Sequence, residues 1–536
     1  MKPKVKNRKS PAREVAKAKR TRSKLRLLDR LSVCGIQPER AFLIVGFIFG
    51  VAILILTPPF QVPDEPQHFF RAFQLSEGRF RDLVVLAPDE KDGMRSGRYG
   101  TMLPKSLSAL VDSSDVANIR FRPQSKVKIS KLWANLTTTL NPKDREYLPV
   151  PDYPPAAYIP QVIGIWIGRI LRLSPLLMFY LARLAALCVW LALTFTAIRT
   201  TPVLKWGCFV LALMPMALFL AGSSSSDSII LGVSFLLSAT LFRWAYDSSK
   251  DRISTWDLAA LLAMAFVIAL SKAIYLSLLL LYFLVPLSKF SSRKMYYGGI
   301  AVVLAFSVGV YFGWTQWPRS MMLDGAASRA PAAQPQTSQP AANESPEADP
   351  PKAQLSRYGV DESPYSGISP EKQKQFIMSH PITLARVLVN TVSISSSFYL
   401  NSFIGYLGWL DTPLPSWLIY TYAITLIVAC LLSPDKVNWK QRTVAGAVFA
   451  LTALASLLYL YIGWTNVGRA SIEGLQGRHL IPVAPALLLV FSAKSGPALR
   501  NVVAIILIAL VVLTNSIAAY VLIERFYLPS VPSILT

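Results

Sequence analysis

Cysteine, histidine and acidic side chains are scarce in this sequence. Its 536 residues include four cysteines and three histidines, and 30 Asp and Glu residues stand against 55 Lys and Arg residues. The four cysteines, Cys34, Cys188, Cys208 and Cys430, are scattered, and the last three lie inside hydrophobic runs. Neither a disulfide framework nor a zinc site is therefore indicated. The strand alternation that is typical of a transmembrane β-barrel is also missing from the pattern.

Long uncharged hydrophobic runs dominate what is present. Hydrophobic residues make up 53% of the chain and charged residues only 16%, and the mean hydropathy is +0.41. A bilayer core requires about 20 apolar residues for each helix that crosses it, and runs approaching that length recur along most of the sequence. The sequence therefore predicts an all-α, polytopic helical membrane protein.

The net charge of +25 is unevenly distributed along the chain. Residues 1–40 carry 14 Lys and Arg residues against Glu14, Asp29 and Glu39. Such a segment can contact anionic lipid or nucleic acid, or it can simply hold the N-terminus in the cytoplasm. We expect the last of these, with residues 1–40 as a basic cytoplasmic tail and no nucleic acid among the partners.

The placement of Lys and Arg between the hydrophobic runs predicts which runs cross the membrane. The first crossing covers 41–57 and leads into a first extracytoplasmic loop at 58–153. The segment 154–168 is rich in proline, and 386–410 is rich in Ser, Asn and Gly, so we expect both to return to the side on which they begin. About 11 crossings result, with the C-terminus outside. If both segments span the membrane instead, 13 helices result.

The domain prediction is a single transmembrane domain over 41–524. It includes a second long external loop at 317–385. Within that loop, residues 325–352 contain no aromatic or branched aliphatic side chain. They cannot bury enough apolar surface to offset the entropy of ordering, so we expect them to be disordered.

Under this topology the unusual polar residues fall at the external boundary. The candidates are Asp64, Glu65, His68, Asp227, Lys272, Asp411, Gln476 and Arg478. An ionisable group at bilayer depth costs about 2.5–3.5 kcal/mol on insertion scales, so isolated ones are candidates for function. The serines at 223–226 are better explained as a polar helix cap than as a nucleophile, because no GxSxG motif or base partner accompanies them.

Each candidate also has a purely structural explanation. Asp64 and Glu65 stand between prolines and suit a solvated turn. Lys272 can extend its amine to the interface without further role, and Arg478 suits an ordinary helix boundary. Arg183, within a hydrophobic run, is either the buried partner of an acid or an anchor at a helix end. The functional interpretation depends on acids and cations reaching one membrane face together.

Acids and cations at an outer membrane boundary suit one particular chemistry. A carboxylate can take a proton from an acceptor hydroxyl as a general base. Lys and Arg can neutralise the charge that develops on a phosphate leaving group. A substrate with a lipid tail would lie between helices and present its phosphate at headgroup level. These features together describe sugar transfer from a polyprenyl-phosphate donor.

A set of motifs along roughly residues 40–525 resembles a known family. They read "PPFQVPDEPQHFFRAF", "YPPAAYIPQVIG", "PMALFLAGSSSSDS", "LSKAIYL", "FIGYLGWLDTPLP" and "GLQGRHLIP". The set resembles DUF2142, a family of predicted bacterial membrane proteins of unknown function that is grouped with the GT-C superfamily of integral membrane glycosyltransferases. The resemblance implies a GT-C-like fold.

The resemblance also implies roles for particular residues. Asp64 and Glu65 take the place of the catalytic acids in the first external loop, and Asp227 resembles the second external acidic position. Lys272 and Arg478 fit the phosphate-binding role. His479 stands where an aromatic residue is expected after "GR", which puts a catalytic part for His479 in doubt.

The expected function is therefore an inverting glycosyltransferase of the bacterial cytoplasmic (inner) membrane, active on the periplasmic side. It would transfer a sugar from a polyprenyl-phosphate-linked donor to a glycan or lipid acceptor in cell-envelope biosynthesis. Asp64 would act as base, and Glu65 would orient it or take its role. We expect no metal ligands and no obligatory cofactor, with a divalent metal still possible. Alternatives are a transporter or flippase, a non-catalytic assembly protein, and a polymerase or ligase of lipid-linked polysaccharide.

The remaining substrate-binding assignments complete this expectation. They place the bound donor and acceptor against His68, Asp227, Lys272, Asp411, Gln476 and Arg478. Membrane lipids surround the helices as further partners.

Overall fold

The computed structural model describes residues 36–80, 84–86, 98–316, 367–431, 437–492 and 500–529. The predicted disorder of 325–352 and nearly all of the basic tail at 1–40 lie outside the described residues. Within the described part the protein is helical almost throughout, and eight helices are long and apolar enough to cross a bilayer. The prediction of an all-α, polytopic membrane protein is confirmed.

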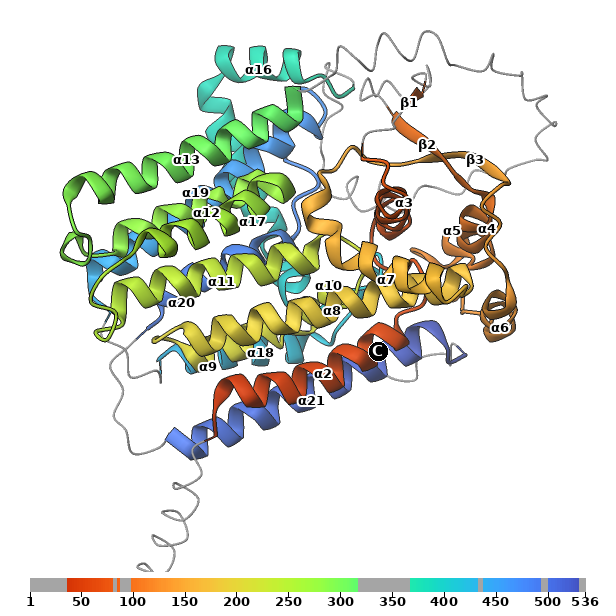
Figure 1. Cartoon of the computed structure of the whole chain (residues 1–536), viewed down its shortest axis with the longest axis horizontal. Coiled ribbons are helices and arrows are strands. Elements are labelled where there is room, and N and C mark those ends of the chain that lie inside the picture. The colour runs from red at the N-terminus through yellow and green to blue at the C-terminus, as the bar shows by residue number, and fades with distance from the viewer. Residues whose placement is uncertain are drawn as a thin grey trace, which may run out of the picture.

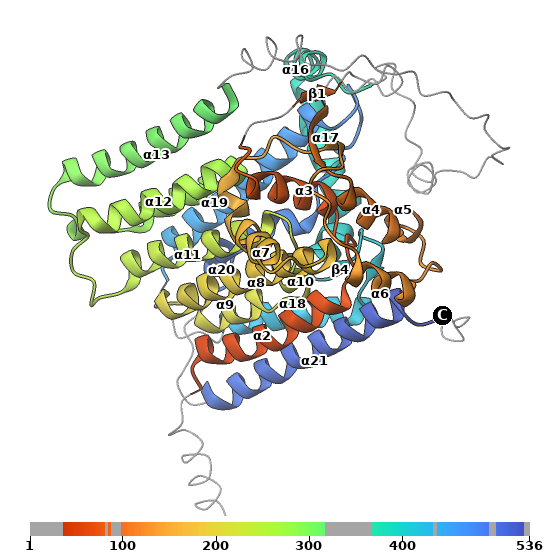
Figure 2. The ribbon, with the colours of Figure 1, turned by 45° about the vertical axis from the view of Figure 1, so that its right-hand side comes forward.

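The long helices lie side by side in one bundle (Figures 1 and 2). Eleven segments among the described residues run from one end of this bundle to the other. They are α2 (Pro38–Leu56), α8 (Pro175–Thr200), α9 (Lys205–Ala212) with α10 (Pro215–Ala221), α11 (Asp227–Tyr246), α12 (Thr255–Lys272), η2 (Ala273–Leu284), α13 (Arg293–Gln316), α18 (Ser416–Leu431), α19 (Trp439–Gly463), η4 (Gly477–Val483) with α20 (Ala484–Val490), and α21 (Arg500–Phe526). By length and composition, eight helices among the described residues suit a bilayer crossing, so the expected 11 or 13 crossings stay a prediction.

A sharp reversal at Lys272 separates α12 from η2. Lys272 leaves the helical region of backbone space, with φ −141° and ψ 91°. At the far ends of the two segments, the backbone N–H of Ile253 donates a hydrogen bond of 2.8 Å to the carbonyl oxygen of Lys289, within η3 (Leu287–Lys289). The two hydrophobic runs on either side of Lys272 therefore form a hairpin of two passes, as the sequence predicted.

The first segment that does not traverse the bundle is α7 (Ile159–Ile170), which follows η1 (Pro155–Tyr158). It packs so closely on α8 that a Cβ at Gly164 would overlap with the backbone of Leu181. Near its C-terminus, the indole of Trp166 donates to the carbonyl oxygen of Ser76. Near its N-terminus, Gln161 donates to the carbonyl oxygen of Ser225, just before α11. Both ends of α7 thus lie at the same end of the bundle.

The second segment that does not traverse the bundle is α17 (Pro381–Ile404), which follows α16 (Pro370–Ser379). The Gln373 side chain of α16 accepts a hydrogen bond from the backbone of Gly468, just beyond α19. After α17, the indole of Trp409 donates to the carbonyl oxygen of Phe60, just beyond α2. The prediction that these two segments return to their starting side therefore agrees with the structure.

Residues 58–153 fold into a small lobe at that end of the bundle, which we call the lobe end (Figure 1, right-hand side). Its elements are α3 (Glu65–Ser76), α4 (Lys105–Ser113), α5 (Val116–Ile119), α6 (Ile129–Thr137) and an antiparallel sheet of β1 (Val84–Leu86), β2 (Arg98–Pro104) and β3 (Arg145–Pro149) in the order β1-β2-β3. A short two-stranded ribbon, β4 (Tyr406–Leu407) with β5 (Thr412–Pro413), lies at the same end.

The sequence predicted only a polar loop for 58–153, and the structure corrects this. The segment has its own hydrophobic core, in which Phe60, Phe69 and Leu107 are completely buried together with Phe179 of α8. Its helices are short, and each contributes only a few apolar residues to one face. That pattern is too weak to stand out in sequence, although burial of the combined faces stabilises the lobe.

Basic side chains mark the opposite end of the bundle. Lys289 donates to the carbonyl oxygen of Asp247 over 2.6 Å, and Lys250 lies 2.8 Å from Asp257. Arg199 and Lys205 join α8 to α9 in the same region. The basic connections that the structure describes are therefore gathered at one end, and the polar candidates lie at the other.

Candidate functional site

Asp64 stands at the point where the chain leaves α2 and enters the lobe. It is the residue before α3 and has a left-handed backbone (φ 63°, ψ 6°), which aspartate tolerates better than most residues. Phe60, four residues earlier, also has a positive φ of 63°. The Asp64 side chain is exposed, and no hydrogen bond joins its carboxylate to another described residue. It is a free carboxylate in a strained turn, a combination that recurs at functional sites.

Glu65, its neighbour, lies in the opposite environment. Its side chain is 0% exposed and forms an ion pair with the equally buried Arg183. Arg183 donates from Nε to Oε1 over 2.8 Å and from Nη2 to Oε2 over 2.6 Å. The backbone N–H of Ser224 also donates to Oε1, over 2.9 Å. Both carboxylate oxygens are thus occupied, and water has no access to them.

Arg183 uses its remaining N–H donors to cap the C-terminal end of α2. Its guanidinium donates to the carbonyl oxygens of Leu54, Thr57 and Pro58 over 3.1, 2.7 and 3.1 Å, and it stacks 4.5 Å above the Phe179 ring. The open question about Arg183 is answered: it is the buried partner of an acid. A carboxylate held in this way cannot take a proton from a substrate, so the expected catalytic role of Glu65 is corrected to a structural one.

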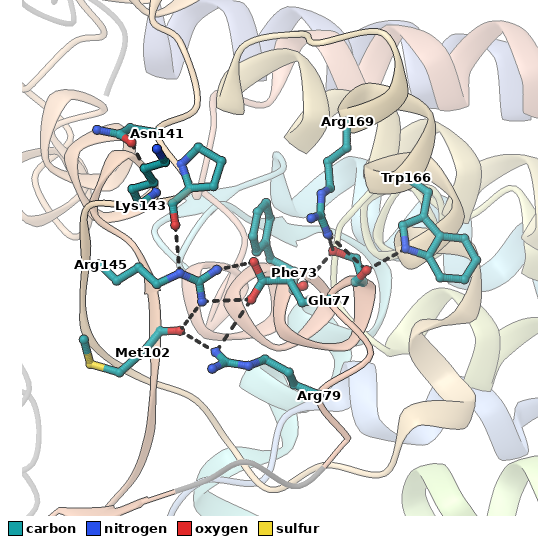
Figure 3. A network of polar contacts seen from close by, with 11 residues as sticks. Phe73, Glu77, Arg79, Met102, Asn141, Lys143, Arg145, Trp166 and Arg169 are labelled. Atoms are coloured by element: carbon teal, nitrogen blue, oxygen red, sulfur yellow. Dashed lines mark hydrogen bonds and ion pairs between the residues drawn. The ribbon is translucent and has the colours of Figure 1, made fainter.

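The C-terminal end of α3 is held by a second polar network (Figure 3). Arg145 of β3 forms a two-point ion pair with Glu77, and both Arg145 and Arg79 donate to the carbonyl oxygen of Met102. On the other side, Arg169 of α7 donates to the carbonyl oxygen of Ser76 over 3.1 Å. The helix that follows Asp64 is therefore anchored at both ends.

Asp227 and Lys272 meet although 45 residues separate them in the chain. Asp227 is the first residue of α11, where the helix dipole favours a negative charge. Lys272 is at the turn between α12 and η2, and its Nζ lies 2.7 Å from Oδ1 of Asp227. The lysine side chain remains 37% exposed. The hairpin turn thus brings one cation to the lobe end of the bundle, with part of its surface open.

Arg478 reaches the same region from η4. A Cβ at Gly477 would overlap with the carbonyl oxygen of Tyr399, so only glycine permits this close approach of η4 to α17. The N–H of Gly477 donates to the hydroxyl of Ser402 over 2.7 Å, which completes the contact. Arg478 is only 7% exposed, yet its guanidinium donates no hydrogen bond to any described residue, and its Nε is buried without a partner.

His68 lies among these charges, one turn into α3. Its Nδ1 is 2.6 Å from the hydroxyl of Tyr158, and its ring stacks on Tyr153 at 5.5 Å between centroids. Burial lowers the pKa of the His68 imidazole to about 4. The charges that also act on this imidazole belong to Asp227, Asp64, Lys272 and Arg478. His68 is therefore neutral at pH 7 and marks the centre of what we call the polar cluster: Asp64, His68, Asp227, Lys272 and Arg478.

The structure adds aromatic residues to this cluster that the sequence analysis did not single out. Partial burial, together with the nearby negative charges of Asp64 and Asp227, raises the pKa of the Tyr153 phenol to about 12. Tyr158 binds His68. Both tyrosines belong to the run "YPPAAY", at the start of the motif "YPPAAYIPQVIG". Two tyrosines spaced around paired prolines were the signal that could have identified them.

Gln476 and His479 flank Arg478 in sequence and make the contacts that hold the start of η4. Gln476 precedes η4, and its N–H donates to Nδ1 of His479 over 3.4 Å. The carbonyl oxygen of His479 accepts a hydrogen bond of 2.7 Å from the Tyr275 hydroxyl of η2. The Tyr275 contact holds the start of η4 against η2, and the charges of Arg478 and Lys272 both act on Asp227.

Asp411 lies outside the polar cluster and forms an ion pair with Arg525. Its Oδ2 is 2.7 Å from Nη2 of Arg525 at the end of α21, and it accepts a hydrogen bond of 3.0 Å from the backbone of Phe121. Its Oδ1 accepts from the backbone N–H of Trp409 over 3.1 Å. The predicted substrate-binding role of Asp411 is therefore corrected: the residue connects β4–β5, the lobe and α21, and its carboxylate is used in doing so.

A cavity of about 480 Å³ opens on the lobe next to Asp64. It is lined by Asp64, Pro66, Gln67, Phe70, Val111, Asp112, Asp115, Val116, Ala117, Asn118, Arg120, Pro149 and Trp409. Asp64 thus faces this cavity while its charge also reaches His68 in the polar cluster. Among the described residues, no group of three or more His, Cys, Asp and Glu side chains is arranged to hold a metal ion.

The arrangement can perform acid–base chemistry next to an anion. Asp64 provides an exposed carboxylate, and Lys272 and Arg478 provide two cations, one of them buried and without a hydrogen-bond acceptor among the described residues. The serines at 223–226 are buried and support this frame through Ser224, which binds Glu65. The side chain of Ser226, the residue before α11, makes no capping hydrogen bond, but the hydroxyl of Ser225 accepts one of 3.2 Å from the backbone N–H of Asp227.

Comparison with known proteins agrees with the sequence motifs. Residues 47–487 match the family described as "Predicted membrane protein (DUF2142)". No curated protein and no solved structure matches the chain. Because the match covers most of the 536 residues, the chain belongs to the DUF2142 family of predicted membrane proteins.

Proposed function

We propose that this protein is a membrane-bound glycosyltransferase of the GT-C type. It transfers a sugar from a polyprenyl-phosphate donor to a glycan or lipid acceptor in cell-envelope biosynthesis. The lobe end faces the periplasm of a bacterial inner membrane, and the basic end and the N-terminal tail face the cytoplasm. The orientation follows from the basic connections at the opposite end of the bundle.

The observation that carries the proposal is the buried Nε of Arg478, which has no hydrogen-bond acceptor among the described residues. Arg478 is 7% exposed, although the charge of Asp227 acts on it. Leaving a buried donor of a charged group without an acceptor is costly. Lys272 adds a second, partly open cation. An anionic group of the substrate would complete this site, and the planar guanidinium suits the oxygens of a phosphate.

The position of the two cations favours a phosphate that is attached to a lipid. Lys272 lies at the turn between two hydrophobic passes, and Arg478 begins a third. Both are at the lobe end of the apolar segments, which corresponds to headgroup depth when the bundle lies in a bilayer. A donor with a polyprenyl tail between the helices would place its phosphate at this level.

Asp64 supplies the base in this mechanism. Its carboxylate takes the proton of an acceptor hydroxyl as that oxygen forms a bond to the anomeric carbon of the sugar. The bond between the anomeric carbon and the phosphate oxygen breaks at the same time, and its electron pair stays on the phosphate. Lys272 and Arg478 stabilise the negative charge that accumulates there. The products are the glycosylated acceptor and polyprenyl phosphate.

The test is an assay in proteoliposomes that contain the purified protein and a panel of polyprenyl-phosphate hexoses and pentoses. Bacterial envelope glycolipids and oligosaccharides serve as acceptors. We expect release of polyprenyl phosphate together with a labelled glycan product, and a loss of at least about a hundredfold in Asp64→Asn. Asp251→Asn, an exposed aspartate at the basic end, is the matched control and should retain full activity.

Two results would overturn the proposal. If Asp64→Asn folds normally and keeps full transfer, Asp64 is not the base. If the intact protein carries the donor across the bilayer and forms no glycosidic bond with any acceptor, the protein is a flippase. The second result would leave the anion site in place and remove the transfer reaction.

A further inference from the structure

The cavity next to Asp64 has the size and mixed lining of a ligand site. Its volume of about 480 Å³ lies within the range of roughly 300–1,000 Å³ that is usual for small-molecule pockets. One wall comes from α3, through Gln67 and Phe70, and the opposite wall comes from the α4–α5 region. Trp409 closes the cavity from the β4–β5 ribbon. Three parts of the chain that are distant in sequence therefore meet around it.

The charge of this cavity is opposite to that of the anion site. Its lining contains the carboxylates of Asp64, Asp112 and Asp115 against the single guanidinium of Arg120. Hydrogen bonds from Asn118 and Lys131 lower the pKa of Asp115, so this carboxylate is charged at neutral pH. Lys131 lies 3.1 Å from it and balances its charge, whereas Asp64 and Asp112 have no ion-pair partner among the described residues. Asp64 stands between the two regions, with cations on the side of the polar cluster and a surplus of acids on the side of the cavity.

Trp409 is held rigidly at the edge of the cavity. Its indole N–H donates to the carbonyl oxygen of Phe60 over 3.0 Å, and the Arg120 guanidinium lies 5.3 Å from its ring centroid. Its backbone N–H binds Asp411, which is fixed by Arg525 over 2.7 Å. The ion pair at Asp411 thus acts as a positioning device for the tryptophan.

We infer that this cavity is the acceptor site and that it selects a neutral or amino-bearing carbohydrate. The inference rests on the proposed function and deepens it by naming the chemical class of the acceptor. The C–H face of a sugar ring can pack on the fixed indole of Trp409, since aromatic rings bind through both apolar area and their π face. Gln67 and the carboxylates of Asp64 and Asp112 supply hydrogen-bonding groups for the hydroxyls. One hydroxyl then reaches Asp64, whose carboxylate accepts its proton.

The opposite charges on the two sides of Asp64 direct the donor to one side and the acceptor to the other. The phosphate of the donor is attracted by Lys272 and Arg478 and repelled by Asp112, and less strongly by Asp115, because Lys131 pairs with Asp115. An acceptor that carries phosphate or uronate groups meets the same repulsion, because like charges brought together without a partner are costly. The cavity therefore excludes acidic sugars and keeps the two substrates apart.

The test measures acceptor binding apart from transfer. Fluorescently labelled protein in nanodiscs is applied to an array of neutral, amino-sugar and uronate-containing oligosaccharides. A second arm measures binding of neutral and acidic glycolipids placed in the nanodisc bilayer, which distinguishes a free glycan from a lipid-linked one. We expect neutral or amino sugars to bind in at least one arm and the acidic ones to bind at least about tenfold more weakly.

Variants of the cavity make the test specific. Trp409→Ala should weaken binding by about tenfold, and Trp409→Phe should keep most of it. Trp256→Ala is the matched control, because Trp256 is an exposed tryptophan at the basic end. The double variant Asp112→Asn, Asp115→Asn should allow acidic sugars to bind while neutral sugars still bind. Asp411→Asn should weaken binding less than Trp409→Ala, since it acts through the position of the indole.

Contrary results have clear meanings. Equal binding of acidic and neutral sugars, no sugar binding in either arm, or equal behaviour of Trp409→Ala and Trp256→Ala would overturn the inference. Failure of the proposed function looks different: sugar binding would still depend on Trp409, but no donor would be consumed. If transfer depends on Asp64 and not on Trp409, the function holds and the acceptor site lies elsewhere.

Discussion

Nζ of Lys272 lies 2.7 Å from Oδ1 of Asp227, and this contact joins the α12–η2 turn to the first residue of α11. Asp227 is 19% exposed and Lys272 is 37% exposed, so the pair is open on one side. Asp227 holds the amine close to its place in the absence of an anion. A phosphate that binds to Lys272 and Arg478 would approach from the open side and share the amine with Asp227.

Neutralising the cations should weaken use of the donor. A hydrogen bond to a charged group contributes about 1.5–3 kcal/mol, so Lys272→Met and Arg478→Met should each lower kcat/KM for the donor by roughly ten- to a hundredfold. Lys272→Arg should keep part of the activity, because it keeps the charge. Initial rates over a range of donor concentrations provide the measurement, and Lys374→Met, an exposed lysine on α16, is the control. An unchanged kcat/KM in both Met variants would rule out the anion site.

Breaking the pair of Glu65 and Arg183 should destabilise the fold. Removing one partner of a buried ion pair typically costs about 3–5 kcal/mol, because the other charge stays buried without compensation. We expect Glu65→Gln and Arg183→Met each to lower the free energy of unfolding by this amount, and the double variant to lose less than the sum of the two. Thermal unfolding in detergent measures the effect, with the exposed Glu371→Gln as control. A Glu65→Gln protein of normal stability and no activity would return Glu65 to the catalytic role.

His68 should make the protein less stable in mild acid. Burial lowers its pKa to about 4 in the folded state, whereas an unfolded histidine titrates near 6.5. Protonation therefore favours unfolding, and stability that is present above pH 6.5 is lost as the pH falls toward 4. The melting temperature of the native protein should fall more between pH 7 and pH 5 than that of His68→Gln. His380→Gln, an exposed histidine variant, should behave like the native protein. Equal pH responses of the native protein and His68→Gln would contradict the assignment.

Gly477 should tolerate no side chain. A Cβ at this position would overlap with the carbonyl oxygen of Tyr399 and approach the backbone of Phe403, so Gly477→Ala must push η4 away from α17. We expect a loss of stability of at least about 1–3 kcal/mol and a loss of donor binding, because Arg478 moves with η4. Gly309→Ala on α13, where a Cβ meets nothing within 4 Å, should fold normally. Wild-type melting behaviour of Gly477→Ala would show that the contact is looser than described.

The order of passes through the bundle could be read from the sequence to a large extent. Hydrophobic runs mark the segments, and basic residues such as Arg199 and Lys289 mark one end because charged side chains avoid the bilayer interior. The hairpin at Lys272 and the returning segments α7 and α17 followed from the same reasoning. The fold of the lobe did not, because its helices are short and bury their apolar faces against one another and against α8.

The composition and spacing of the chain by themselves determined the class of protein, the order of its passes and the end at which the polar residues gather. Only the tertiary structure decided which of these residues are free to act. Asp64 and Glu65 are adjacent in sequence, but Arg183 reaches only Glu65. Asp411 is bound by Arg525, 114 residues away. The physical reason is that a carboxylate is free to react only if packing gives it no ion-pair partner. Such partners come from distant parts of the chain.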